Sequence, residues 1–346
     1  MKRSLVVLSI LAALTLIGVT AAVADSVGPI TFEPTMYTVG NINGQSGWTK
    51  TGTYDAAVAA LASFPAASGY GFGTQALRIS NTVTTQGFDD QTFAPPLTNA
   101  AGESTAFNHF DATFSIGTAL ATQQTGLMLS VSPDDGTGGR MSYLRFDDQL
   151  DGVHVFFDDV TDAGPLGTVA TFNEHDIATL DRAHAHTVRF SIDFAPGAGN
   201  DVVKIYIDGV LKATGTTWEN YYRYDPEQAV NHNVVPVTRT LIFLARGTAA
   251  PGTSGNGFLI DNVSYASSNL TAATGKDACK HGAWKTLTNP SFKNQGQCVK
   301  FMNHQNKHNP GKDGGADSDT QGANGSAAQT HAGNDAEHSK GGNGKG

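Results

Sequence analysis

The stretch His186–Phe194, HTVRFSIDF, predicts the fold of most of this chain. Apolar residues stand at every second position, and the residues between them are polar, namely Val188, Phe190, Ile192 and Phe194 against Arg189, Ser191 and Asp193. Successive side chains of a β-strand point to opposite faces, so this spacing gathers the apolar residues on one face. The stretch therefore predicts a strand that covers a hydrophobic core and presents its polar face outward.

The same alternation recurs between about Pro29 and Tyr265. Phe110–Ile116, FDATFSI, repeats it, and turn-forming residues separate shorter runs, namely PITFE, ALRIS, GLMLSVS, MSYLRF, GVHVFF, RTLIFLA and GFLIDNVSY. Many short alternating segments are typical of an antiparallel sandwich or barrel. Helical periodicity is scarce, and its one candidate is the alanine-rich stretch Tyr54–Phe64, YDAAVAALASF. We therefore predict an all-β fold.

The dipeptide Asp208-Gly209 predicts a β-hairpin, because it lies between two apolar runs and suits a type I′ turn, which needs positive φ at both positions. This turn pairs Ile207 with Val210, Tyr206 with Leu211, and Ile205 with Lys212. The predicted core face consists of Val203, Ile205, Ile207 and Val210. The other face carries Lys204, Tyr206, Leu211 and Ala213, and this mixed surface either binds a ligand or is covered by a loop.

The N-terminal residues 1–24 have the order of a secretory signal peptide. Lys2 and Arg3 precede the apolar run LVVLSILAALTLIGV, and the small residues Ala22-Val23-Ala24 stand before Asp25. A retained membrane anchor is the alternative, because the run is near the lower length limit for spanning a bilayer. No later stretch is apolar enough to span a membrane. We therefore expect a secreted protein, extracellular or at the cell surface.

The charge of the chain argues against nucleic acid as a partner. The formal net charge of −9 becomes −11 when the two positive charges of Lys2 and Arg3 leave with the signal peptide. Phosphate binding requires clustered Lys and Arg, which an acidic chain of this kind does not offer.

Cys279 and Cys298 are the only cysteines, and in an oxidising compartment we expect them to form a disulfide. Closing this loop would stabilise the folded chain by roughly 3 kcal/mol. A zinc site completed by His281 and His304 is the alternative.

Composition divides the remaining chain into segments. We expect the sandwich to span residues 25–266, a linker 267–278, and a cysteine-bounded module 279–303 with a small core of Trp284, Phe292 and Phe301. The tail, residues 304–346, is rich in Gly, Asn, Asp and Lys, and it is expected to be disordered because it cannot bury enough apolar surface.

Two regions resemble known families. The blocks NGQSGW, QALRISN, MSYLRFDDQLDGVHVFFDD, VKIYIDGVLKATGTTWENYYRYDPEQ and GFLIDNV, which extend over most of the mature chain, resemble secreted bacterial concanavalin A-like (laminin G-like) domains. The segment CKHGAWKTLTNPSFKNQGQCVKF resembles a short C-terminal module of exported bacterial proteins. The resemblance implies an antiparallel jelly-roll sandwich and export, but no particular activity.

Sandwiches of this type include glycan hydrolases, polysaccharide lyases and lectins, so we searched for catalytic carboxylates. Laminarinase-type glucanases carry Glu-x-Asp-x-x-Glu on one strand. Glu174 and Asp176 fit this motif, but Thr179 stands where the second Glu is needed. Retaining hydrolysis requires two carboxyl groups about 5 Å apart, so we predict no catalytic residue and interpret EHDIAT as a loop before the strand at Thr187.

Metal-binding candidates are histidines and aspartates. His184 and His186 would share one side of a strand and form a metal site with Glu174, His175 or Asp176, although exposed histidines are the simpler interpretation. His154 is interpreted as an outer-face residue. A structural calcium is the only cofactor considered, with no defined ligand set, because acidic residues cluster near strand ends. Local turn formation explains these acidic residues equally well. They are Asp134, Asp135, Asp147, Asp148, Asp151, Asp158 and Asp159.

An aromatic cluster after the hairpin is the best candidate for a ligand-binding site. The predicted ligand-binding residues are Trp218, Tyr221, Tyr222, Arg223 and Tyr224, with Glu219 and Asp225 between them. Aromatic rings pack on the apolar faces of sugars, and charged groups bind hydroxyls. The alternative is that these rings cap the hydrophobic core.

The sequence thus favours a non-catalytic module that binds a glycan or another extracellular polymer. A glycan-cleaving hydrolase or lyase would need two carboxyl groups facing each other in a cleft. A purely structural surface or matrix protein would need no pocket. Exposed rings beside a groove would favour the binding module.

Overall fold

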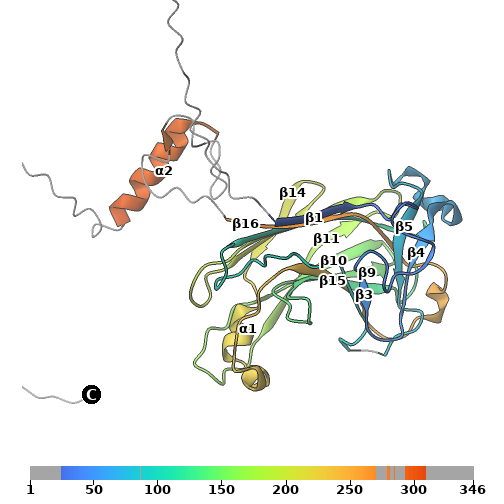
Figure 1. Cartoon of the computed structure of the whole chain (residues 1–346), viewed down its shortest axis with the longest axis horizontal. Coiled ribbons are helices and arrows are strands. Elements are labelled where there is room, and N and C mark those ends of the chain that lie inside the picture. Colours follow the sequence, from blue (N-terminus) through green and yellow to red (C-terminus); the bar gives the residue numbers. More distant parts are fainter. Residues whose placement is uncertain (1–24, 86, 270–278, 281–283, 285–292, 309–346) are drawn as a thin grey trace, which may run out of the picture. The chain divides into compact units, whose positions relative to one another are not determined.

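The computed structural model describes residues 25–85, 87–269, 279–280, 284 and 293–308, and the chain divides into two units (Figure 1). The first unit holds all the strands of the described residues, and the second holds helix α2 (Gln295–His308). The predicted signal peptide, most of the predicted linker and residues 309–346 of the predicted tail lie outside the described residues. Among the described helices, none combines the length and apolar character needed to cross a bilayer.

The first unit is an antiparallel sandwich of two sheets, as predicted. The nine-stranded sheet consists of β14 (Val210–Gly215), β13 (Val202–Ile207), β12 (His186–Asp193), β7 (His109–Thr118), β16 (Phe258–Ser268), β5 (Gln75–Ser80), β4 (Asp55–Ala60) and β2 (Gly40–Asn41), with β1 (Asp25–Ile30) paired to β16. The seven-stranded sheet consists of β11 (Phe172–Leu180), β10 (Gly152–Val160), β9 (Tyr143–Gln149), β8 (Met128–Asp134), β15 (Thr240–Ala245), β6 (Gln91–Phe93) and β3 (Thr49–Lys50). Neighbouring strands are often distant in sequence, as in a jelly roll, and the predicted all-β class with an antiparallel jelly-roll sandwich is confirmed.

Short helices connect some strands. Helix α1 (Glu219–Tyr224) follows β14, and the short 3₁₀-helices are η1 (Leu61–Ser63), η2 (Pro65–Gly69), η3 (Pro226–Asn231) and η4 (Pro251–Thr253). Figure 1 shows the two sheets as facing layers, with α1, in yellow, beside one end of them.

The core between the sheets consists of the alternate apolar residues. Val188, Phe190 and Ile192 are fully buried, as predicted, whereas Arg189 lies on the outer face and pairs with Asp111. At the centre, the Phe114 ring of β7 meets Phe146 of β9 and Phe243 of β15 edge-on, at centroid distances of 6.2 and 5.8 Å. Burial of such rings from both layers is the main stabilising contribution to a sandwich.

The predicted hairpin forms, with one change of register. Asp208 and Gly209 have φ of 50° and 76°, and Ile207–Val210 and Tyr206–Leu211 pair as predicted. The predicted Ile205–Lys212 pair is wrong, because a β-bulge shifts Ile205 onto Ala213. The bulge turns Ala213 toward the core, so its predicted face is wrong. Val210 is 57% exposed next to the turn of the edge strand β14, so its predicted place in the core is wrong as well.

The helix predicted for Tyr54–Phe64 is wrong. Asp55–Ala60 forms strand β4, which pairs with β5 and β2 and buries Ala56 and Val58 on its core face. Pairing on both sides outweighs the weak local helix preference of alanine.

In the C-terminal unit, Cys279 and Cys298 form the predicted disulfide, with Cα atoms 5.6 Å apart. The zinc alternative is wrong, because the two sulfurs bond to each other. Helix α2 was not predicted, and it continues to His308, past the predicted start of the tail at residue 304. Trp284 and Phe301 are half-buried, whereas Phe292 lies outside the described residues.

Candidate functional site

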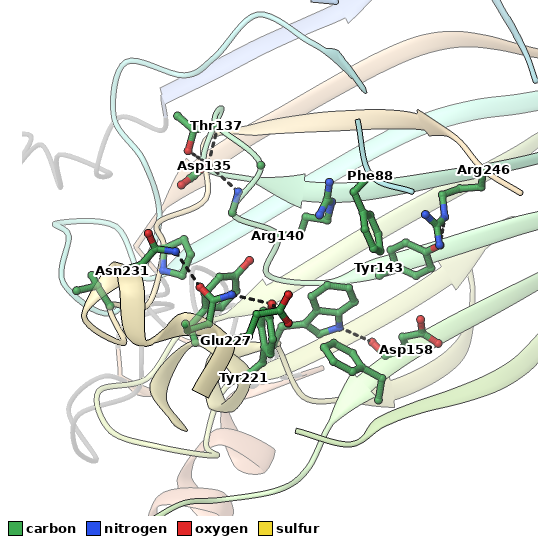
Figure 2. A pocket seen from close by; sticks show the side chains of 18 residues that line it. Phe88, Asp135, Thr137, Arg140, Tyr143, Asp158, Tyr221, Glu227, Asn231 and Arg246 are labelled. Atoms are coloured by element: carbon green, nitrogen blue, oxygen red, sulfur yellow. Dashed lines mark hydrogen bonds between the residues drawn. The ribbon is translucent and has the colours of Figure 1, made fainter. Parts of the chain in front are cut away.

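A cavity of about 830 Å³ lies over the outer face of the seven-stranded sheet (Figure 2). Its floor includes Tyr143 of β9 and Asp158 of β10, which are cross-strand partners. Each of these residues alternates with a core residue, Leu144 or Phe157, so both side chains point away from the core. The cavity walls come from the loops after β5, β8 and β15 and from the segment α1–η3.

One wall is a continuous set of aromatic rings. Trp218 stacks on Tyr143 at 5.6 Å, and Phe172 of β11 meets Trp218 edge-on at 4.7 Å. Tyr221 contacts Phe172 at 5.3 Å and Tyr222 at 5.0 Å. Phe172 is 42% exposed, so this wall offers apolar ring surface to a ligand.

The segment after the hairpin is helical, and this decides which predicted ligand-binding residues share a face. Trp218, Tyr221 and Tyr222 have the spacing i, i+3, i+4, and all three line the cavity. Trp218 and Tyr222 are also buried, so these rings pack and line the cavity at the same time.

Arg223 and Tyr224 do not line the cavity. Arg223 pairs with Glu103 at 2.5 Å and approaches Glu219, its i,i+4 partner on another face of α1, at 3.5 Å. The ring of Tyr224 lies directly against the Cα of Gly164, where no side chain would fit. These two predicted ligand residues therefore serve packing and anchoring of α1 in this structure.

A carboxyl cluster anchors the side of α1 opposite the aromatic wall. Glu219 is 1% exposed and accepts a hydrogen bond from the Asn200 backbone N–H at 3.1 Å. Asp201, 3% exposed, accepts hydrogen bonds from the Thr217 hydroxyl and the Ala195 backbone N–H, each at 2.8 Å. Burial raises the pKa of Asp201 to about 7.

Two arginines flank the aromatic ring of Phe88 at another side of the cavity. The guanidinium carbon of Arg140 lies 4.6 Å from the Phe88 ring centroid, and that of Arg246 lies 4.3 Å from it. Arg246 donates hydrogen bonds to the Tyr143 hydroxyl at 3.1 Å and to the Gly87 carbonyl at 2.6 Å. The sequence interpretation did not include these residues. The only sequence signals for them are that Arg140 directly follows the loop DDGTGG and that Arg246 directly follows the apolar run TLIFLA.

The loop between β8 and β9 is built by two aspartates. Asp134 Oδ1 accepts from the backbone N–H groups of Gly136 and Gly138, at 2.6 and 3.2 Å. Asp135 Oδ1 likewise accepts from Thr137 and Gly139. These aspartates thus form the turn, which was the alternative to the calcium prediction.

The other acidic candidates near the cavity's sheet also have protein partners. Asp147 pairs with Arg145, Asp148 with Arg182, and Asp151 with His154. Within the described residues, no group of three or more His, Cys, Asp or Glu side chains could hold a metal ion.

Asp158 is the carboxyl group at the cavity floor. Its Oδ1 is buried without a hydrogen-bond partner among the described residues, and the Trp218 indole N–H donates to its backbone carbonyl at 3.1 Å. Burial, and then the nearby Glu174 carboxylate, raise the pKa of Asp158 to about 6. A carboxyl group of this kind can act as a proton donor near neutral pH.

The motif EHDIAT forms part of strand β11, so its interpretation as a loop is wrong. Glu174 pairs with Arg145 at 2.5 Å and Asp176 with His154 at 2.7 Å, and neither carboxylate lines the cavity. His184 is exposed and bound to Asp181, whereas the His186 side chain is only 12% exposed and binds Asp208, so the expected exposure holds for His184 alone.

No family model and no curated protein sequence matches this chain. Among solved structures, a sialidase aligns over 72% of this chain and 20% of its own, with 12% identity and a TM-score of 0.35. An endo-beta-1,4-glucuronan lyase from the fungus Trichoderma reesei aligns over 66% of this chain and 91% of its own, with 14% identity and a TM-score of 0.34. An endo-1,3-beta-glucanase from Streptomyces sioyaensis aligns over 68% of this chain and 96% of its own, with 14% identity and a TM-score of 0.35. Likeness at this level assigns neither an activity nor a ligand, and membership of a secreted concanavalin A-like family stays a prediction.

Proposed function

We propose that this protein is an exported binding protein that holds a glycan in the cavity beside α1. The observation that carries the proposal is the aromatic wall of Phe172, Trp218 and Tyr221, which stands next to polar side chains in one cavity. Sugars present apolar C–H faces and hydroxyl edges, and they need both kinds of surface.

The polar groups beside Tyr221 are suited to binding hydroxyls. The Tyr221 hydroxyl donates to Glu227 at 3.1 Å and accepts from the Gln228 amide at 2.7 Å. The Asn231 amide donates to Gln228 Oε1 at 3.1 Å, and all of these residues line the cavity. This network fixes the orientation of the donors and acceptors before a ligand binds, which reduces the entropy lost on binding.

Replacing Tyr221 by alanine is expected to weaken glycan binding about tenfold or more, because it removes a ring face and a hydroxyl of the network. A glycan array probed with the mature full-length chain would identify the ligand, and isothermal titration would give the affinity. Tyr206→Ala is the matched control, since Tyr206 lies on β13 in the other sheet. Binding that Tyr221→Ala leaves unchanged, or an array without binding, would contradict the proposal.

Glycan cleavage is a second candidate, and the buried Asp158 carboxyl group favours it, because a pKa of about 6 suits a general acid. Incubating the chain with any glycan that it binds, followed by analysis of reducing ends and unsaturated products, separates the two functions. Cleavage that Asp158→Asn abolishes would replace the binding proposal by an enzymatic one.

Export is proposed from the signal-peptide pattern and from the Cys279–Cys298 disulfide, which persists in oxidising compartments. The intact mass of the exported protein is expected to correspond to a chain that begins at Asp25. A mass that includes residues 1–24 would indicate a retained anchor instead.

A further inference from the structure

Arg140 has a buried guanidinium group that is only partly hydrogen-bonded within the described residues. The residue is 8% exposed, and its Nε and Nη2 atoms have no hydrogen-bond partner in the described part of the chain. No carboxylate of a described residue lies within 4 Å of it. Burial lowers the pKa of Arg140, but an arginine in this setting remains charged. A buried charge of this kind is costly unless another group satisfies it.

The second cavity arginine increases this imbalance. Arg246 lies over the same Phe88 ring, and it too has no described carboxylate within 4 Å. Its hydrogen bonds go to a hydroxyl and a carbonyl. Most other described arginines do form ion pairs, namely Arg78, Arg145, Arg182, Arg189 and Arg223. Arg239 forms none either, but it does not line the cavity. The cavity therefore gathers two guanidinium groups that form no ion pair within 4 Å in the described residues, although Asp134 lies near Arg140 and Asp158 near Arg246.

We propose, building on the proposed glycan-binding function, that the ligand is an anionic glycan whose carboxylate or sulfate group binds Arg140 and Arg246 beside Phe88. Guanidinium groups bind such anions through charge-assisted and often bidentate hydrogen bonds. The free donors of Arg140 lie at this site, and Phe88 is 45% exposed, so a ligand reaches it from solvent.

Of the three cavity carboxylates, Asp135 and Glu227 orient the ligand, whereas Asp158 lies on the floor beside Tyr143, near Arg246 but without an ion pair to it within 4 Å. Asp135 and Glu227 lie at other parts of the lining than Phe88 and the two arginines, as Figure 2 shows. Repulsion by Glu227 directs the anionic group away from Tyr221, and the arginine pair attracts it toward Phe88. The neutral part of the sugar is left for the rings and amides around Tyr221.

The test compares matched oligosaccharides that differ only in charge. Isothermal titration of the mature full-length chain uses hexamers of β-1,4-glucan and β-1,4-glucuronan, of β-1,4-mannan and β-1,4-mannuronan, and the sulfated glucan hexamer. We expect an acidic hexamer to bind at least about tenfold more tightly than its neutral partner, and Arg140→Gln and Arg246→Gln each to weaken that binding about tenfold to a hundredfold. Comparing the uronate hexamers with the sulfated glucan hexamer shows whether the site prefers a carboxylate or a sulfate group.

The variants and controls separate the possible failures. Arg189→Gln changes the net charge equally but lies on the nine-stranded sheet, so it is expected to bind like the unmodified chain. If Arg140→Gln does not fold, Arg246→Gln still tests the site, because Arg246 is only half-buried. Equal binding of neutral and acidic hexamers would overturn the anionic ligand but not glycan binding. The same holds for an acidic preference that survives both substitutions, whereas no binding by any hexamer would overturn both proposals.

Discussion

Replacing Phe114 by alanine is expected to lower the free energy of unfolding of the sandwich by about 3–5 kcal/mol. Phe114 is fully buried in β7, and its ring contacts Phe146 and Phe243, which belong to two strands of the opposite sheet. The substitution removes apolar contacts to both layers and leaves a cavity that the surrounding strands cannot fill without moving. A loss of this size is a large share of the stability of an ordinary domain.

Urea denaturation followed by circular dichroism would measure this loss. Phe114→Leu is the matched control and is expected to cost only about 1–2 kcal/mol, because leucine refills most of the volume. Val230→Ala, at a side chain that is 80% exposed, is expected to change the stability by less than about 0.5 kcal/mol. A cost below about 1 kcal/mol for Phe114→Ala would mean that the sheets do not meet at this ring.

The second large effect is a fall in the free energy of unfolding as the pH rises from about 5 to 9. Burial raises the pKa of Asp201 and of Asp261 to about 7, and that of Asp134 to about 6. An aspartate whose pKa is raised in the folded state binds a proton that the unfolded chain releases near pH 4. The stabilisation that this proton gives to the folded state is therefore fully present below the pKa of the aspartate in the unfolded chain. It is lost as the pH rises through the pKa of the aspartate in the folded state.

His109 acts in the same direction at higher pH. Burial disfavours its charged form, but hydrogen bonds to Asp111 and Asp193 outweigh burial and raise the pKa of His109 to about 9. Its stabilising contribution is thus present below about pH 6.5 and is lost as the pH rises through 9. At the acid end, Arg78 outweighs burial and lowers the pKa of Asp55, so that contribution is lost only as the pH falls below the usual range of an aspartate. Stability is expected to be greatest near pH 5.

Denaturation at several pH values, with Asp201→Asn as the test variant, would measure these contributions. From pH 5 to pH 8 the contribution of Asp201 to the free energy of unfolding is expected to decrease by about 2–3 kcal/mol, because one pKa unit corresponds to about 1.4 kcal/mol. Asparagine keeps the size of the side chain and can still bind Thr217, so the variant is expected to lose this part of the pH dependence. Asp89→Asn, at an exposed position, is the control. A variant with an unchanged pH profile would show that Asp201 is ionised in the folded protein.

The strands of the core could be predicted from sequence because period-two alternation follows from backbone geometry alone. Val188 and Phe190 therefore lie where the pattern places them. Strand β11 gave no such signal, because it is an edge strand whose residues, such as Glu174 and Asp176, are largely exposed. The bulge at Ile205 depends on the fit of β13 between two neighbours, which local sequence does not encode.

The candidate site could be predicted only in part. Trp218, Tyr221 and Tyr222 are close in sequence, so their clustering was visible, but a six-residue helix is too short for its periodicity to be recognised. Packing against the sandwich stabilises α1, and this packing turns Arg223 away from the rings. Phe88 and Arg246 come from distant loops, and only the strand order brings them to the same cavity.

Because Trp218 lines the cavity, its intrinsic fluorescence can report ligand binding. The chain has three tryptophans, of which Trp48 is sealed between the sheets and Trp284 belongs to the C-terminal unit. The indole of Trp218 alone lines the cavity, and a bound molecule would displace water near it. Emission from a Trp284→Phe variant would then follow occupancy directly, without a dye or label.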